Sequence, residues 1–261
     1  MSGDAMADEF DVVPGWTVDA VRELGPGNAL PAACRGSGGP AGLRWFADRL
    51  GLAAGTRLLD SGAGVGGPAE WAARERRCRV VLVDPMPGAC RAAAALFGRP
   101  TVVGLGEHLP CADAAVDAAW SLGVLCVSSD QPGLLAELAR VVRPGGAVGL
   151  LVYTRRISDV WNQPQGNDFP SPGSLESMVE DAGLIIVDRA ELAGLEPDPA
   201  WWTERQNAVA AVIARDHGSD ERWRTADDQA RAMARLVDTG HVGGSLILAH
   251  TPPSSATTPV G

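Results

Sequence analysis

The chain contains no lysine, because all 22 of its basic residues are arginine. A Schiff-base lysine and a lysine general base are therefore excluded. Tyrosine occurs only once, at Tyr153, so the chain also lacks a convincing tyrosine and lysine pair for redox chemistry linked to NAD.

Positive charge is also scarce. The 22 arginines stand against 32 acidic residues, which gives a net charge of −10 and an isoelectric point near 4.8. Nucleic acids and anionic membranes both bind to basic surfaces. We therefore expect neither as a partner, and small-molecule chemistry becomes the first expectation.

Long apolar runs and paired cysteines are missing as well. No stretch of about 18 apolar residues is present to span a membrane, and the first ten residues are acidic where a signal peptide would be basic. The five cysteines include no C-x-x-C pair and have no histidine cluster nearby, which indicates free thiols in a reducing compartment and no metal site. These features predict a cytoplasmic protein and leave open whether it is a monomer or a homodimer.

The most informative stretch that is present runs from Arg57 to Ala72 and reads RLLDSGAGVGGPAEWA. A short apolar strand ending at Asp60 leads into a glycine-rich turn, and Pro68 then occupies a position where a helix begins. Strand, glycine turn and helix together describe the nucleotide-binding corner of a doubly wound α/β sheet. With 261 residues, of which 46% are hydrophobic, the chain is long enough for one such domain.

The glycines alone do not select the cofactor. Gly62, Gly64 and Gly67 satisfy the pattern G-x-G-x-x-G of dinucleotide-binding folds. Asp60, two positions before the first glycine, has a carboxylate that would face the ligand and repel a pyrophosphate at close range. S-adenosylmethionine (SAM) has no phosphate and carries a sulfonium and an ammonium, which an acid attracts. The corner therefore favours SAM over NAD.

A second acid follows the next apolar run, CRVVLVD, which ends at Asp84. Continuous apolar runs are typical of parallel strands that are covered on both faces. Asp84 lies about 20 residues beyond the glycine turn, where doubly wound folds use an acid to bind a ribose diol. Two acids at the carboxyl ends of neighbouring strands favour a ligand site over solvated surface.

The remaining pattern predicts a Rossmann-like α/β sheet of seven strands. Strands are expected at residues 57–60, 78–84, 100–104, 116–121, 147–153, 184–192 and 244–250. Helices are expected at residues 41–52, 69–77, 88–97, 132–142, 174–183, 199–217 and 220–239. The last two helices form a hairpin insertion within residues 197–240. The domain plan is thus an arm and lid at 1–40, a SAM-binding domain at 41–250 and a disordered tail at 251–261.

Within the arm, residues 1–12 are acidic and aperiodic, and residues 25–40 are too rich in glycine and proline for regular structure. Arg35 lies among small residues in the second segment. Two interpretations stay open: a flexible lid in which Arg35 reaches a carboxylate of the cofactor, or a solvated connector.

Four segments in chain order resemble the class I SAM-dependent methyltransferases: LLDSGAGVGG, VVLVD, GEHLPCADAAVDAAWSLGVL and ELARVVRPGGAVGLLVY. The resemblance covers about Gly55 to Tyr153. It implies SAM as the cofactor and a sheet of order 3-2-1-4-5-7-6 whose last strand is antiparallel.

By this resemblance, the methionine part of SAM would lie against Asp60 and the backbone of Gly62 and Gly64. Asp84 would bind the ribose hydroxyls, and Met86 would lie along the adenine.

The loop after the third strand departs from the family pattern. Many relatives read G-D-A-E-x-L-P there, and the aspartate bonds the adenine amino group, whereas this chain has Leu105. By the same resemblance, backbone amides near Gly106, with help from Glu107, would hold the adenine. After the fourth strand, Ser121 and Leu122 would line the SAM pocket.

Methyl transfer from a sulfonium is an in-line displacement, so the enzyme mainly aligns the acceptor with the methyl group in a dry site. A general base is required only if the acceptor must lose a proton early. His108, which follows the cofactor loop, and Tyr153, at the end of the fifth strand, are the candidates. Each can equally be a loop or packing residue.

Aromatic residues gather in the segments that cover the core. A pocket for a flat or apolar small-molecule acceptor is expected to contain Trp16, Trp161, Phe169 and Trp201. Alternatively, Trp201 packs the two hairpin helices together with Trp202 and Trp223.

Three functions remain open. The favoured one is methyl transfer from SAM to a small metabolite or secondary metabolite. The second is a non-methylating reaction, such as cyclisation or pericyclic rearrangement, on a SAM-binding protein of the same fold. The third, an oxidoreductase linked to NAD, is disfavoured by Asp60.

Overall fold

The computed structural model describes residues 8–254. Its strands are β1 (Arg57–Ser61), β2 (Arg79–Asp84), β3 (Thr101–Val103), β4 (Val116–Leu122), β5 (Val142–Arg155), β6 (Ile185–Glu191) and β7 (Val242–His250). Its longer helices are α2 (Val13–Leu24), α3 (Ala29–Ala33), α4 (Gly39–Arg49), α5 (Gly67–Arg76), α6 (Pro87–Phe97), α7 (Gln131–Val141), α8 (Pro172–Asp181), α9 (Ala200–His217) and α10 (Glu221–Asp238). Short helical turns are η1 (Asp8–Val12), η2 (Pro26–Asn28), η3 (Leu125–Val127) and η4 (Leu192–Gly194).

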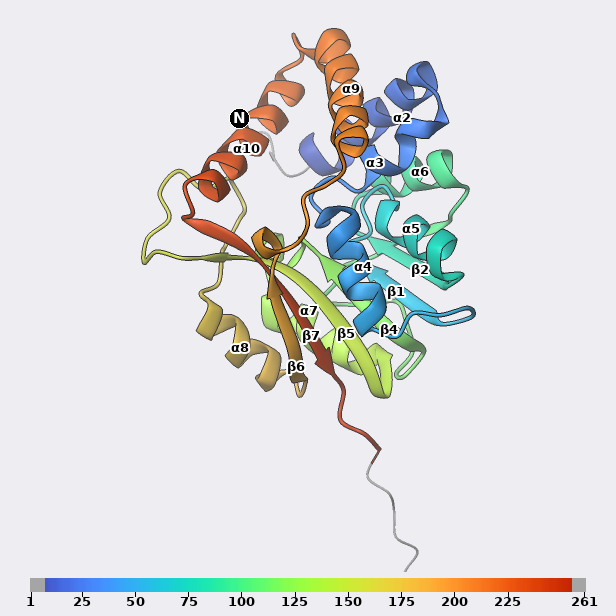
Figure 1. Ribbon diagram of the computed structural model, residues 1–261, viewed down its shortest axis with the longest axis vertical. Coiled ribbons are helices and arrows are strands. Elements are labelled where there is room, and N and C mark those ends of the chain that lie inside the picture. Colours follow the sequence, from blue (N-terminus) through green and yellow to red (C-terminus); the bar gives the residue numbers. More distant parts are fainter. Residues whose placement is uncertain (1–7, 255–261) are drawn as a thin grey trace, which may run out of the picture.

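The strands form one sheet in the order β3-β2-β1-β4-β5-β7-β6. The pairs among the first five strands are parallel, and β7 is antiparallel to both of its neighbours. Helices lie on both faces of this twisted sheet (Figure 1). The predicted fold class is therefore confirmed, including the two-helix insertion before the last strand.

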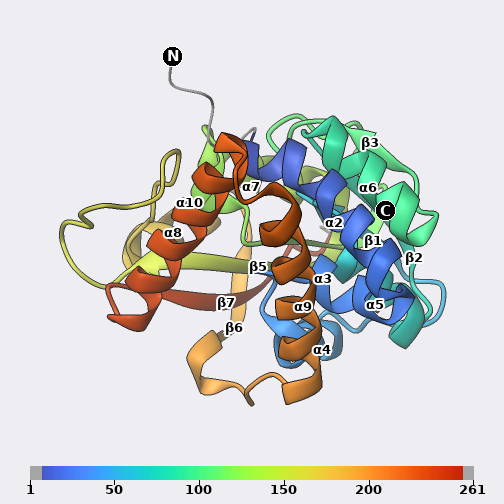
Figure 2. The same cartoon turned by 90° about the horizontal axis from the view of Figure 1, so that it is seen from above.

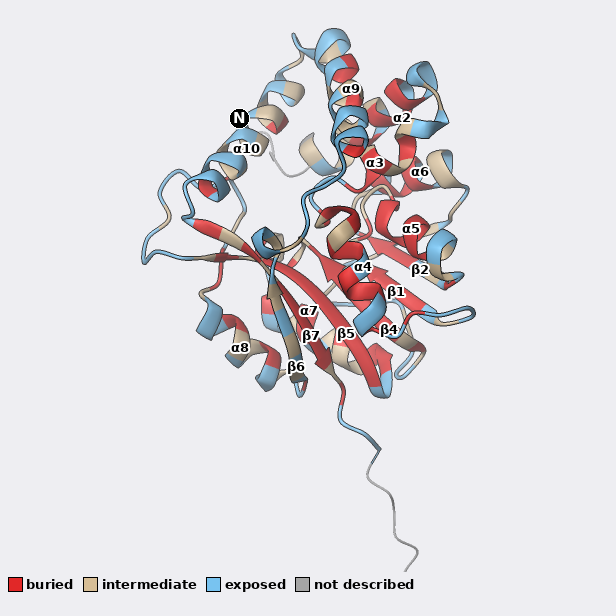
Figure 3. Ribbon diagram, viewed as in Figure 1, coloured by how far each residue is buried: buried red, intermediate tan, exposed pale blue. Residues whose placement is uncertain are grey.

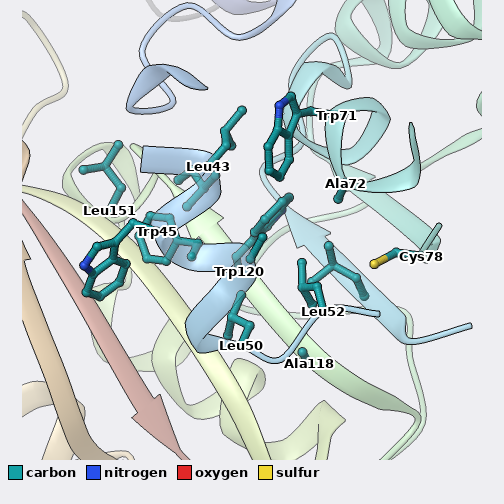
Figure 4. Close-up of a cluster of buried hydrophobic side chains, with 14 of the residues drawn as sticks. Leu43, Trp45, Leu50, Leu52, Trp71, Ala72, Cys78, Ala118, Trp120 and Leu151 are labelled. Atoms are coloured by element: carbon teal, nitrogen blue, oxygen red, sulfur yellow. The ribbon is translucent and has the colours of Figure 1, made fainter. Parts of the chain in front are cut away.

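The sheet is buried on both faces, and its central strands are among the least exposed parts of the chain (Figure 3). On one face, Trp120 of β4 is fully buried in a cluster with Leu43 and Phe46 of α4 (Figure 4). On the other face, Leu135 and Leu138 of α7 are fully buried against the strands. Full burial of one such side chain stabilises the fold by about 1.5–3 kcal/mol, so both layers hold the strand ends in place.

The arm differs most from expectation. Residues 25–40 were expected to lack regular structure, but η2, α3 and the start of α4 occupy them. Gly25 and Gly38 have φ values of 94° and 82° and separate these helices, while Pro26 and Pro40 stand in first turns, where proline loses no hydrogen bond. Glycine and proline thus delimit short helices here.

Two further boundaries differ in detail. The helix expected to be capped by Ser174 begins earlier, because the side chain of Ser171 accepts the hydrogen bond from the Ser174 backbone N–H. The fifth strand begins at Val142, so it includes the turn-like residues before Ala147. Residues 1–7 and 255–261, parts of the predicted arm and tail, lie outside the described residues.

The insertion between β6 and β7 covers the edge of the sheet where the parallel strands end. In Figure 2, α9 and α10 diverge from their connection; α9 packs on α2 and α3, and α10 packs on η1. Within residues 8–254, no helix combines the length and apolarity that crossing a membrane requires.

Candidate functional site

The glycine turn joins the end of β1 to the start of α5. Gly62 and Gly64 have φ values of 75° and 52°, in the left-handed region that favours glycine. A Cβ at Gly62 would come within 2.4 Å of the Val124 side chain, whereas a Cβ at Gly64 would meet no atom within 4 Å. The backbone is therefore open to a ligand at Gly64, while Val124 fills the space at Gly62.

Asp60 is the least satisfied group in this corner. Its side chain is 1% exposed, and its Oδ2 atom has no hydrogen-bond partner among the described residues. Burial raises the pKa of Asp60 to about 7, and the charge of Asp84 adds to this rise. The indole of Trp120 and the backbone N–H of Ala69 oppose it, but the Trp120 indole N–H and the Asp60 Oδ2 atom are both left without a completed hydrogen bond. A buried acceptor without a partner is uncommon in folded proteins and calls for a ligand with a positive or donating group.

Asp84 is also buried, but its carboxylate is occupied. One oxygen accepts a hydrogen bond from the Gly64 N–H at 2.7 Å, and the other accepts from the Met86 N–H at 2.9 Å. Burial raises the pKa of Asp84, and these two donors oppose the rise. Asp84 therefore fastens the glycine turn to the start of α6, with lone pairs left for ribose hydroxyls.

Two of the other predicted cofactor residues, Gly106 and Ser121, lie beside Ser61, which the sequence analysis did not single out. The buried Ser61 hydroxyl has no partner in the described chain. A Cβ at Gly106 would lie 3.3 Å from it, and the Ser121 hydroxyl donates to the Ser61 carbonyl at 3.1 Å. Leu122, next to Ser121, is buried in the core cluster of Trp120. The position of Ser61 between Asp60 and the first glycine was the available signal.

Glu107 lies on the same loop as Gly106 and is half-buried, and the structure gives its side chain no hydrogen bond within residues 8–254. Met86 is the residue before α6 and is also half-buried. Both residues border the corner, and their predicted contacts with adenine stay predictions.

The segment between α3 and α4 packs directly on the corner. A Cβ at Gly67 would lie 2.4 Å from the Ala33 carbonyl oxygen, and one at Gly123 would lie 3.1 Å from the Gly36 carbonyl oxygen. Cys34 between them is buried, which raises its pKa, and the charge of Asp60 adds to this effect. The segment covers the cofactor corner, as a lid would.

The N-terminal turn η1 closes the neighbouring side. The carboxylate of Asp11 accepts a hydrogen bond from the Gly88 N–H in the first turn of α6. An acid at this end of a helix is favoured by the exposed N–H groups there. The sequence offered no signal for this contact, because Asp11 is one acid among several in an aperiodic segment.

The two candidate bases do not lie at the glycine turn. His108 is exposed beside α7, where its charge contributes to lowering the pKa of Glu137. Tyr153 packs against a cluster that contains Cys126 and Phe169. Burial raises the pKa of Tyr153 to about 12 and that of Cys126 to about 11, so both are protonated at neutral pH.

The structure does not bring the four predicted pocket residues together. Trp16 stacks on His217 with ring centroids 4.2 Å apart, and Phe169 is buried in the Cys126 cluster. Trp161 is 79% exposed, and Trp201 is half-exposed with the Arg205 guanidinium 5.1 Å from its ring. Each of the four rings therefore packs against different residues or faces solvent, and they do not line one pocket.

The alternative packing role of the tryptophans is observed only for Trp223 of α10, whereas Trp201 and Trp202 contact each other on α9 with ring centroids 5.5 Å apart. Trp202 is buried in the cluster of Trp120, under α4. Trp223 packs against a different cluster, built from α2, α3 and α9. Trp223 therefore joins α10 to a cluster that includes α9, while Trp202 fixes α9 to the core under α4.

Residues 59–150 match a family model described as a methyltransferase domain. Malonyl-acyl-carrier-protein O-methyltransferase of Serratia marcescens is 36% identical over 118 residues, which cover 43% of this chain and 46% of that protein. Methyltransferase GfsG of Streptomyces halstedii is 32% identical over 166 residues, which cover 56% of this chain and 59% of that protein. The chain therefore spans about half the length of the curated relatives it matches.

A solved structure extends the likeness of fold to most of the chain. The (4+2)-cyclase SpnF superposes with a TM-score of 0.65 over 81% of this chain and 80% of that one, at 24% sequence identity.

Proposed function

Because the chain belongs to the class I SAM-dependent methyltransferases, we propose that it transfers the methyl group of SAM to a small-molecule acceptor. The observation that carries this proposal is the buried, unpartnered oxygen of Asp60. SAM brings two positive groups, and attraction to a cation offsets the cost of keeping this carboxylate charged in a buried site. A pyrophosphate would increase that cost.

The glycine corner has a residue suited to each part of SAM. Asp60 binds the cationic methionine part, Asp84 accepts from the ribose hydroxyls, and Met86 and the Gly106 backbone hold the adenine. The open space over Gly64 admits the ligand to the turn. When bound, SAM supplies an electrophilic methyl group on a good leaving group.

The chain's own contribution is then alignment and exclusion of water. The segment from Ala33 to Gly36 covers the corner, and a dry site keeps the acceptor aimed at the methyl group. No side chain is assigned as general base, because Tyr153 has a pKa of about 12 and His108 is exposed beside α7. An acceptor that is already nucleophilic needs none.

The names of the relatives support a small chemical group as the acceptor. One relative is named as an O-methyltransferase of a malonyl group on its carrier protein. We propose a metabolite or secondary metabolite as the acceptor of this chain, and the net charge of −10 is consistent with a partner other than nucleic acid.

Ligand binding tests the cofactor. We expect calorimetry to show binding of SAM and S-adenosylhomocysteine but not of NAD. At 100 times its Kd, each SAM compound should stabilise the fold by about 2.7 kcal/mol, which thermal-shift measurements detect. Absence of binding by both SAM compounds would contradict the proposal.

Two points support a second function, a non-methylating rearrangement on a SAM-binding protein. No general base is assigned to this chain, and the SpnF structure, whose fold this chain shares, is described as a (4+2)-cyclase. Incubation of metabolite acceptors with methyl-labelled SAM separates the two functions. Labelled product supports methyl transfer, and product without label supports a rearrangement on a SAM-binding protein.

A further inference from the structure

A cavity of about 570 Å³ lies between α9 and α10, outside the glycine turn. Most of its lining residues belong to α9, to α10 or to their connection, and Figure 2 shows how these two helices diverge. One wall is formed by small residues of α9 and its end, namely Ala210, Ala211, Ala214 and Gly218. Such a wall offers a flat, weakly polar surface to the body of a ligand.

The opposite wall comes from α10 and contains Trp223 and four charged residues. Among the charged residues, Arg231 forms an ion pair with Asp227 on the same helix. The Arg224 guanidinium donates to the Gly218 carbonyl at 3.4 Å. Both arginines of this wall therefore already have partners.

Arg35 completes the lining and differs from these two arginines. Its guanidinium makes no hydrogen bond or ion pair with any residue between 8 and 254. The acid that feels its charge is Glu9 of η1, and burial raises the pKa of Glu9 to about 7 even though Arg35 opposes the rise. Burial thus favours the protonated form of Glu9, which does not neutralise the charge of Arg35.

Arg35 also connects the cavity with the cofactor corner. Its neighbours Ala33 and Gly36 contact Gly67 and Gly123 at the corner, while Arg35 itself lines the cavity. The cavity and the cofactor corner therefore border the same short segment, so a ligand in the cavity lies next to the corner.

We propose that the cavity between α9 and α10 binds the methyl acceptor, and that Arg35 recognises a carboxylate or phosphate group on it. This inference rests on the proposed methyl transfer. It replaces the predicted contact of Arg35 with the cofactor carboxylate, because Arg35 lines the cavity and its neighbours contact the corner. The acceptor is then an anionic compound whose apolar body lies along the alanines of α9.

Calorimetry with three probes of one shape tests the anion site: 2-naphthoate, 2-naphthyl phosphate and the neutral 2-naphthamide. We expect one or both anions to bind the wild-type chain at least tenfold more tightly than the amide, and the preferred anion identifies the group. In Arg35→Gln this preference should fall below threefold. Arg235→Gln, which removes an exposed arginine of α10 outside the cavity, should retain it.

Filling the cavity with Ala214→Trp should weaken all three probes by at least tenfold, and circular dichroism checks that this variant is folded. Equal binding of anions and amide in the wild type, or an unchanged preference in Arg35→Gln, would overturn the proposal. So would a tenfold loss of SAM affinity in Arg35→Gln, since that result assigns Arg35 to the cofactor. Failure of SAM to bind the wild type would instead contradict the proposed methyl transfer, and the anion preference would still report on the cavity.

Discussion

The central pair of strands, β1 and β4, carries a buried or half-buried aspartate near each end, and the two acids have opposite surroundings. At the amino end, Asp117 accepts hydrogen bonds from the Arg57 backbone N–H at 2.9 Å, from the Arg57 guanidinium at 3.0 and 3.1 Å, and from Arg143 at 3.2 Å. These donors hold the pKa of Asp117 well below its usual range. At the carboxyl end, the Oδ2 atom of Asp60 has no partner within the described chain, and its pKa is raised to about 7.

The difference between the two acids indicates where the chain is destabilised in the absence of a ligand. An acid whose oxygens are all occupied serves the structure, whereas a buried acid with a free oxygen destabilises the chain until a ligand supplies the missing partner. Both acids belong to the same strand pair, so the local fold alone does not explain the contrast. The predictions below test whether Asp60 and Asp117 differ in this way.

The largest expected effect is on stability as a function of pH. The pKa of Asp60 is about 7 in the folded chain and 3.8 in a model peptide, so the unfolded state gives up this proton first. The wild type should therefore lose stability as pH rises from about 4 to 7 and regain it on acidification through the same range. Asp60→Asn should be more stable than wild type at pH 8 by roughly 2–4 kcal/mol, with no difference of this origin near pH 4. Urea unfolding at pH 4, 6 and 8 measures this, and a difference that is constant with pH would contradict it.

The next effect is on cofactor affinity. At pH 8, Asp60→Asn should weaken SAM binding by roughly 10- to 150-fold, the equivalent of about 1.5–3 kcal/mol for hydrogen bonds to a charged group. In the wild type, the Kd for SAM should rise by up to about tenfold for each pH unit below 7, because Asp60 takes up a proton and loses its attraction for a cation. Calorimetry from pH 5.5 to 8 measures both, and Asp60→Asn should lack this pH dependence. Equal slopes in the two proteins would remove Asp60 from the site.

A smaller effect is expected at Asp84. Asp84→Ala should weaken SAM binding by about 1–3 kcal/mol, because ribose hydroxyls lose their acceptor and the Gly64 and Met86 N–H groups lose theirs. Hydrogen exchange should show faster exchange at these two amides in the variant without ligand. If SAM affinity is unchanged while these amides exchange faster, Asp84 holds the glycine turn in place but does not bind the ribose.

The fold and the two acids were predictable because their signals are local. Apolar runs, the glycine turn and the acids after β1 and β2 lie within a few residues of one another, and parallel pairing brings strand ends to a common edge. The position of Asp60 before Gly62 indicated that it lies at the glycine turn; its attraction for a cation and repulsion of a pyrophosphate stay predictions.

The packing of the segments that cover the site, namely η1, α2, α3, α9 and α10, was not predictable in the same way, because its contacts join distant parts of the chain. Trp16 stacks on His217, and Asp11 binds the Gly88 N–H; neither pairing leaves a periodic or spaced pattern in the sequence. Aromatic composition indicated an acceptor pocket, yet the cavity between α9 and α10 is lined mainly by alanines and charged residues. Small side chains in a helix have no distinctive pattern, since they are equally common in packed and solvated helices.

The smallest effect is expected at the other end of the strands. Asp117→Asn should leave SAM affinity within twofold of wild type, because its partners Arg57 and Arg143 lie at the opposite edge of the sheet from the turn. Its pKa is lowered in the folded chain, so its contribution to stability exists above about pH 4 and is lost as pH falls further. Partly exposed ion pairs contribute little, and we expect Tm to fall by about 1–3 °C at pH 7, a difference that should shrink as pH falls from about 4 toward 2. A Tm that rises in Asp117→Asn, as expected for Asp60→Asn at pH 8, would show that the two acids do not differ in the way proposed.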